Sequence, residues 1–264
     1  MVMDPAEQWS INLTAGGYEH RCQDKDDLKQ IKRLGSAWRR ILGATRLAPP
    51  ASAFEIGCGG ARNLAKLALN GFSVGGIDLS RAVLARAKQF IAEVESVSDV
   101  RLNIELVKDD FFNFQSEKRY DLVYHYGVVE HYLDPERRAE FWRKALELTV
   151  AGGWIASVVP CGQHLMRPMT RERELLGYRH ELAEIDYSCS SHAEELERAG
   201  MVNIRALPHS YFFFLSDHPN QAVRKVLYPT IFVIGNVLLP WLPLPSSVAE
   251  KLAHTLIVVG QKPE

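Results

Sequence analysis

A glycine-rich loop between two acidic residues carries the strongest chemical signal in the sequence. The stretch 54–63, FEIGCGGARN, leads from an apolar run through three glycines into a helical pattern. A strand, a tight loop and a helix N-terminus in that order let the backbone approach a nucleotide-like ligand. Glu55 precedes the glycines, and Asp78 ends the next apolar run, 21 residues after Gly57. We expect these two carboxylates to decide which ligand binds.

Asp78 is well spaced for contact with a ribose. A carboxylate at the tip of a second strand can accept two hydrogen bonds from a ribose diol; a helix-capping or surface aspartate is the alternative. A further acidic pair, Asp109 and Asp110, follows the third apolar run. A carboxylate there can accept from an exocyclic amine, with Phe111 against a purine face. The alternative is a solvated turn with phenylalanines in the core.

The loop lacks the features that bind nucleotide phosphates. Gly57 and Gly59 fit the dinucleotide pattern G-x-G-x-x-G, but Arg62 stands at the third glycine position, where close packing is expected. The lysine and the Ser or Thr of a P-loop are also missing. Both phosphate-binding interpretations are therefore weakened.

Strand-like and helical patterns alternate around the loop, which predicts a parallel sheet with covered faces. Residues 25–42 place apolar side chains three and four apart, as on one helix face. We expect an N-terminal helical cover, 1–50, and one α/β domain, 51–264, with insertions at 161–192 and 211–252. The predicted strands are 53–56, 72–77, 102–107, 120–124, 154–159, 202–207 and 255–260; the helices are 63–69, 81–94 (capped by Ser80), 135–148 and 193–199 (started by Ser191). Gly152 and Gly153 are expected to turn the chain into the fifth strand.

Composition is typical of a globular protein without a nucleic-acid partner. The chain has 264 residues, 47% of them hydrophobic, and a formal net charge of -1. The four cysteines form no C-x-x-C pair, which argues against a zinc ribbon or a disulfide scaffold and favours reduced thiols. Residues 1–13 do not resemble a signal peptide, and prolines interrupt the most apolar stretch, 227–244. We therefore expect a cytoplasmic protein without a transmembrane segment.

These motifs together resemble the class I S-adenosylmethionine-dependent methyltransferases, a family with a seven-stranded Rossmann-like sheet. The family pattern E/D-x-G-x-G-x-G is met by Glu55, Gly57 and Gly59, with Ala61 at its last position. Its fourth-strand signature is similar to residues 120–131, YDLVYHYGVVEH, and its glycine pair before the fifth strand to GG at 152–153. The resemblance covers about residues 53–160 and the last two strands. It implies a mostly parallel sheet with helices on both faces, an antiparallel last strand and a helical insertion before it.

The resemblance implies S-adenosylmethionine as the cofactor. The family's ribose acid corresponds to Asp78, and its adenine-side acid to Asp110 or, with less support, Asp109. A carboxylate before the glycines can meet the cationic end of the cofactor, directly or through water. No metal is required, and we see no ligand cluster with metal spacing. The expected cofactor-binding residues are Glu55, Gly57, Cys58, Gly59, Asp78, Leu79, Asp110, Phe111, Tyr126 and, from the N-terminal segment, Tyr18.

The acceptor is expected to meet the segments that follow strands four and five, because ligands bind beyond the carboxyl ends of such sheets. Residues 161–191 are dense in groups that bind anions or accept protons. We select His164, Tyr178 and His180 as general-base or orienting candidates. The alternative is an exposed polar loop and helix. Glu130 and His131 are expected to brace their loop rather than to do chemistry.

The apolar insertion 211–252 has three interpretations. It can form a hydrophobic lid over the active site, a dimer surface, or a contact with a membrane surface or lipid acceptor. The oligomeric state is accordingly a monomer or a homodimer.

The favoured function is transfer of the cofactor methyl group to a small, partly apolar metabolite by in-line displacement. Such a site mainly positions the acceptor and excludes water. One alternative is a non-methylating enzyme that cyclises S-adenosylmethionine and releases methylthioadenosine. Another is a non-catalytic protein that binds the cofactor.

Overall fold

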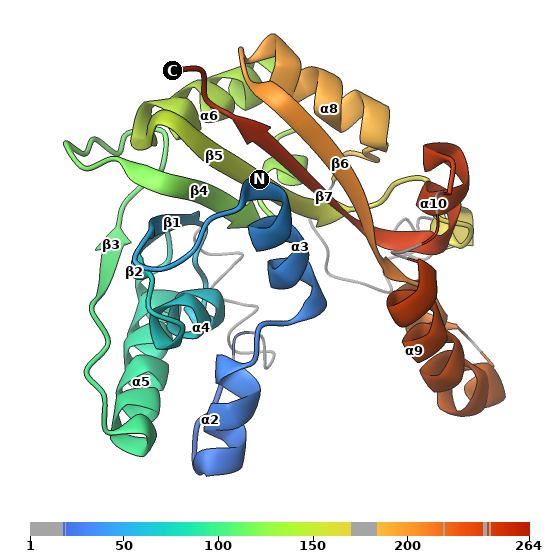
Figure 1. Cartoon of the computed structure of the whole chain (residues 1–264), viewed down its shortest axis with the longest axis horizontal. Coiled ribbons are helices and arrows are strands. Elements are labelled where there is room, and N and C mark those ends of the chain that lie inside the picture. Colours follow the sequence, from blue (N-terminus) through green and yellow to red (C-terminus); the bar gives the residue numbers. More distant parts are fainter. Residues whose placement is uncertain (1–17, 19, 170–183, 219, 240–241, 243) are drawn as a thin grey trace, which may run out of the picture. The chain divides into compact units, whose positions relative to one another are not determined.

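Seven strands form one sheet in the order β3-β2-β1-β4-β5-β7-β6 (Figure 1). The computed structural model describes residues 18, 20–169, 184–218, 220–239, 242 and 244–264. Strand β1 pairs in parallel with β2 and β4, β2 pairs in parallel with β3, and β7 pairs antiparallel with β6. The predicted Rossmann-like sheet with helices on both faces is confirmed. The strands are β1 (Ser52–Ile56), β2 (Ser73–Asp78), β3 (Ile104–Lys108), β4 (Tyr120–Tyr126), β5 (Thr149–Pro160), β6 (Val202–Tyr211) and β7 (Ala253–Gln261).

Contacts within the chain divide it into two units, which are described separately. The first comprises residues 1–126, 143–155 and 262–264, and the second residues 127–142 and 156–261. Helix α6 (Pro135–Leu148) and strand β5 each contribute to both.

The strands of the first unit differ in burial, since β3, at the edge of the sheet, has no buried residue. β1 and β2 are buried over nearly their whole length, as expected for parallel strands covered on both faces. The first two crossover helices are α4 (Arg62–Leu69) and α5 (Arg81–Ser98). Ser80 caps α5 by accepting from the amide of Val83, as predicted. The glycines at 152–153 lie inside β5 rather than before it, and Gly152 has a φ of 71° there. The strand thus starts earlier than predicted.

The N-terminal cover consists of two helices rather than one continuous helix face. Helix α2 (Lys25–Lys32) ends before Arg33, and α3 (Ser36–Thr45) begins after Gly35. Gly35 has extended backbone, and glycine is a poor helix former, so the apolar period continues across a break in the helix. Ile31 of α2 packs with Phe90 and Val94 of α5 in a buried cluster.

The second unit places one helix on its antiparallel strand pair and an insertion between the two strands. Helix α8 (Cys189–Arg198) packs against β6 and β7. It starts earlier than predicted, because Ser188 is its N-cap and Ser191 is the third residue of a capping box. The insertion contains a 3-10 turn, η2 (Phe213–Asp217), a π-helical turn, η3 (Val223–Leu227), helix α9 (Tyr228–Leu238) and helix α10 (Ser246–Leu252). Within the described residues, the structure has no helix that is both long and apolar enough to cross a bilayer.

Candidate functional site

The glycine loop leaves β1 in left-handed backbone and is tied to β2. Gly57 and Gly59 have φ values of 68° and 50°, and Ala61, the N-cap of α4, has a φ of 59°. Only glycine adopts this region without a steric cost, so the loop uses its glycines where they are needed. The amide of Cys58 donates to the carbonyl of Ile77 at 3.0 Å, which fixes the loop against the end of β2.

Asp78 joins the loop to the end of β2. Its Oδ2 accepts from the amide of Gly59 at 2.9 Å, and its Oδ1 accepts from the amide of Ser80 at 2.9 Å. An ionised carboxylate offers about four acceptor positions, so both oxygens keep a lone pair for a ligand. Burial raises the pKa of Asp78, and the two amides act in the opposite direction.

Glu55 is the most deeply buried acid of this site. Only 2% of its surface is exposed, and its oxygens accept from Asn63 Nδ2 at 2.9 Å and from the Tyr124 hydroxyl at 3.2 Å. Trp38 of α3 donates in turn to Asn63 Oδ1 at 3.1 Å. Burial raises the pKa of Glu55 to about 8, and the charge of Asp78 adds to that rise. No sequence pattern predicts the contact with Tyr124, which follows from the register of β1 beside β4.

Within the described part of the chain, the two acids have no cationic side chain to balance them. Among the residues that the structure describes, neither Glu55 nor Asp78 has a Lys or Arg among its hydrogen bonds or its charged influences. Two desolvated acids in one place favour a positively charged ligand, because such a ligand stabilises their ionised form, and an ionised carboxylate repels a phosphate. The site therefore suits a cation that can also donate hydrogen bonds.

Close backbone approaches shape the loop at two glycines. A Cβ on Gly76 of β2 would lie 2.7 Å from Cys58 Cβ and 2.8 Å from Leu64 Cδ1. The close contact that the dinucleotide pattern assigns to position 62 is therefore made at Gly76, and Arg62 is exposed. A Cβ on Gly59 would lie 2.6 Å from Cε1 of Tyr18. The Tyr18 ring thus covers the loop. Burial raises the pKa of the Tyr18 hydroxyl, and the charge of Asp78 adds to this rise.

The other predicted cofactor residues lie at the ends of β2, β3 and β4. Asp110 closes a tight turn, since Oδ1 accepts from the amide of Phe112 at 3.0 Å and Oδ2 from Asn113 Nδ2 at 3.3 Å. The amide of Asp109 donates to the carbonyl of Asp78 at 3.3 Å, which brings the acidic pair beside the ribose candidate. Phe111 is buried, Leu79 is half-buried, and Tyr126 is 42% exposed.

His164 lies in an aromatic cluster of the second unit. Its ring stacks on Phe214 at 5.2 Å and on His254 at 5.5 Å between centroids. Burial lowers the pKa of His164 to about 4, and His254 adds to this shift, so the ring is neutral at pH 7. Its buried Nδ1 has no hydrogen-bond partner among the described residues. Such a histidine is a weak base but a usable hydrogen-bonding group. The other two catalytic candidates, Tyr178 and His180, lie outside the described residues.

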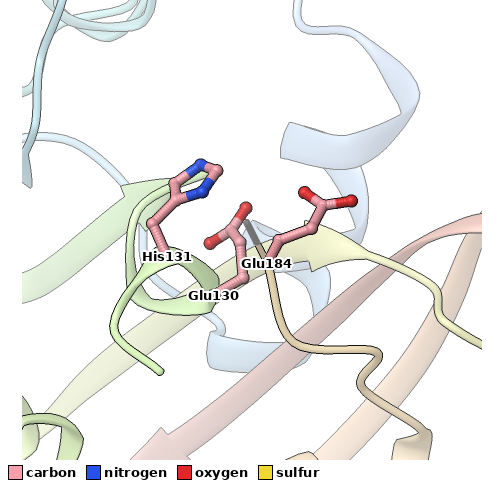
Figure 2. A group of neighbouring side chains, drawn as sticks. All are labelled: Glu130, His131 and Glu184. Carbon is pink, nitrogen blue, oxygen red and sulfur yellow. The ribbon is translucent and has the colours of Figure 1, made fainter. Parts of the chain in front are cut away.

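A second polar cluster forms after β4, where Glu130, His131 and Glu184 bring ligand atoms within 4.8 Å of one another (Figure 2). Glu130 is buried, its Oε2 has no hydrogen-bond partner, and burial raises its pKa to about 8. Carboxylates and imidazole are ligands for divalent cations. The cluster also has its own cation, because Arg167 Nη2 lies 3.2 Å from Glu184 Oε1. The sequence could not predict this grouping, since Glu184 is distant along the chain.

Comparisons with known proteins agree with the fold. Residues 54–155 match a family model described as a methyltransferase domain. The putative methyltransferase of Haloferax volcanii, solved with its Trm112 activator, has a TM-score of 0.59 and 13% identity, covering 100% of both chains. A SAM-dependent methyltransferase of Archaeoglobus fulgidus has a TM-score of 0.56 and 16% identity, covering 89% of this chain and 94% of the other.

Another similar structure was solved with a product of the cofactor. The magnesium protoporphyrin IX methyltransferase of Synechocystis, with bound SAH, has a TM-score of 0.53 and 15% identity, covering 90% of this chain and 82% of the other. No curated protein matches the chain in sequence. Residues 54–155 therefore carry a methyltransferase domain, and the seven-stranded sheet of the chain is similar to the fold of S-adenosylmethionine-dependent methyltransferases.

Proposed function

We propose that the protein transfers the methyl group of S-adenosylmethionine to a small, partly apolar metabolite. The cofactor supplies a methyl group on a cationic sulfonium, from which the group passes in line to a nucleophilic atom of the acceptor. The proposed cofactor residues are those predicted from the sequence, with Asp78 on the ribose, Asp110 on the adenine side and Tyr18 covering the loop.

The observation that carries this proposal is that Glu55 and Asp78 have no cationic partner among the residues that the structure describes. S-adenosylmethionine carries a sulfonium and an ammonium and has no phosphate, so it meets both requirements of the site. The ammonium can hydrogen-bond to the Glu55 carboxylate directly or through water. The free lone pairs of Asp78 can accept from the two ribose hydroxyls.

The remaining residues are proposed to position the cofactor and the acceptor. The left-handed backbone at Gly57 and Gly59 is proposed to turn the loop against the methionine portion of the cofactor. His164 is proposed as an orienting group for the acceptor, because a neutral ring with a pKa of about 4 is a poor proton acceptor at pH 7. Orientation and exclusion of water are the main demands of a displacement at carbon.

A small acceptor is supported by the charge of the chain. The formal net charge of -1 gives no electrostatic attraction to a nucleic acid. Aromatic side chains, including Phe213 and Phe214, surround His164 and His254 in the second unit. An apolar part of the acceptor would match such surroundings.

Calorimetric titration with S-adenosylmethionine tests the cofactor site. Asp78→Ala should abolish measurable binding, whereas Asp26→Ala, at an exposed acid of α2, should bind like the wild type. Unchanged affinity of Asp78→Ala would exclude the ribose assignment. Incubation with the cofactor alone, then with acceptor mixtures, tests the reaction. S-adenosylhomocysteine formed only with an acceptor supports methyl transfer, and methylthioadenosine formed without one indicates cyclisation.

A further inference from the structure

Exposed apolar side chains concentrate on one segment of the second unit. Half of the large apolar residues that are exposed in the described chain lie between residues 226 and 242. Val226, with 71% of its surface exposed, is the most exposed of them all. We call this set the apolar face; it consists of Val226, Leu227, Val233, Ile234, Val237, Leu238 and Leu242.

Helix α9, which carries most of the apolar face, contacts the rest of the second unit through residues on one of its sides. Asn236 Nδ2 donates to the Tyr211 carbonyl at 3.0 Å, and the Tyr211 amide donates back to Asn236 Oδ1 at 3.2 Å. Gly235, the buried residue of α9, sits against Phe212, whose ring would be 2.7 Å from a Cβ there. One side of α9 therefore contacts the rest of the protein, and apolar side chains on its other sides are exposed. A helix that is apolar on nearly all sides is usually covered.

The charged residues in the segment that carries the apolar face are all positive. Between residues 218 and 249 the sequence has no Asp or Glu, and Arg224 and Lys225 are its only Lys or Arg residues. Both are exposed and directly precede Val226. Cationic residues beside an exposed apolar helix suit an anionic lipid surface. A second copy docked on the same face would offer these cations no acidic partner from the matching segment.

We propose that the apolar face docks on the surface of a bilayer that contains anionic lipid. The apolar side chains enter the boundary between headgroups and acyl chains, and Arg224 and Lys225 meet the headgroups. In the described part of the chain, no helix is both long and apolar enough to cross a bilayer. The helix therefore lies in the plane of the interface.

Flotation of the full chain with lipid vesicles tests this proposal. Binding should be about tenfold or more stronger to vesicles of phosphatidylcholine with phosphatidylglycerol than to phosphatidylcholine alone, because each cation contributes separately. Val233→Ser with Val237→Ser should abolish flotation, whereas Val100→Ser with Val202→Ser, exposed elsewhere, should retain it. Arg224→Gln with Lys225→Gln should remove the preference for the anionic lipid. Circular dichroism checks that each variant is folded.

Three results would overturn the proposal. The first is a folded wild-type chain that does not float with anionic vesicles. The second is equal loss of flotation in the Val100/Val202 variant. The third is a dimer, found by light scattering, that the Val233→Ser and Val237→Ser variant dissociates, since the face would then join two copies of the chain.

Discussion

The amide of Gly59 donates a 2.9 Å hydrogen bond to Oδ2 of Asp78, so the loop after β1 and the tip of β2 form one rigid unit. This bond orients the carboxylate that we assign to the ribose. It also fixes the left-handed backbone of Gly59, over which the Tyr18 ring lies. A change at Gly59 therefore acts on the acid, the loop and the ring together.

Gly59→Ala should weaken cofactor binding at least tenfold. The new Cβ would approach Tyr18 Cε1 to 2.6 Å, so the ring must move, and the left-handed backbone costs about 1–2 kcal/mol for a residue with a Cβ. Gly200→Ala is the matched control, because Gly200 has a φ of 92° and open space around it. That variant should lose similar stability without losing cofactor affinity. Equal affinity in both variants, measured by calorimetry, would show that the Tyr18 ring does not shape the site.

The sequence predicted the parts of the site that are local along the chain. Glu55, Gly57 and Asp78 are separated by one strand, one loop and one helix, so their motif is sufficient to place them. The hydrogen bond between Glu55 and Tyr124 depends instead on β1 lying beside β4, which no local pattern shows. The grouping of Glu184 with Glu130 likewise depends on a distant segment returning to the end of β4.

The errors in the predicted element boundaries arise where the period of apolar side chains and the backbone conformation at a glycine disagree. The apolar period of residues 25–42 continues through Gly35, although the backbone there is extended and the helix is broken. Periodicity reports which side chains face the core, and it does not report whether the backbone between them stays helical. The same limit applies to β5, which runs through Gly152 and Gly153 because the backbone there still forms hydrogen bonds with Pro263 and Lys262.

Gly76→Ala should destabilise the fold more than Gly75→Ala. A Cβ on Gly76 would meet the backbone-proximal Cys58 Cβ at 2.7 Å, whereas a Cβ on Gly75 would meet Phe54 Cδ2 at 3.2 Å. Overpacking of a buried site typically costs about 1–3 kcal/mol, and we expect Gly76→Ala in the upper part of that range. Urea unfolding of both variants measures the difference. Equal midpoints would mean that the glycine loop moves away from β2 without cost.

Cofactor binding at pH 7 should release up to one proton. Glu55, with a pKa of about 8, is mostly protonated in the free protein, and a cationic ligand favours its ionised form. Calorimetry in two buffers of different ionisation enthalpy gives the number of protons released. Glu55→Gln should bind more weakly and release none, while Glu117→Gln, at an exposed acid, should behave as the wild type. Proton release that persists in Glu55→Gln would come from another group.

Glu130→Gln should be more stable than the wild type at pH 8, and this advantage should be smaller at pH 5. The carboxyl has a pKa of about 8 in the folded protein against 4.5 as its ordinary value, so below pH 4.5 it is protonated in both states. Between these values only the unfolded chain ionises, and the free energy of unfolding falls with rising pH by up to about 1.4 kcal/mol per unit. Glutamine removes that fall.

The comparison with Glu197→Gln, at an exposed acid of α8, isolates the effect of burial. That control should follow the wild-type stability at both pH values, measured by urea unfolding. A Glu130→Gln variant that loses stability at pH 8 would show that the ionised carboxylate is stabilised in the folded state. Addition of EDTA would then distinguish the two sources of such stabilisation: a bound divalent cation would be removed, whereas the charge of Arg167, which already pairs with Glu184, would remain.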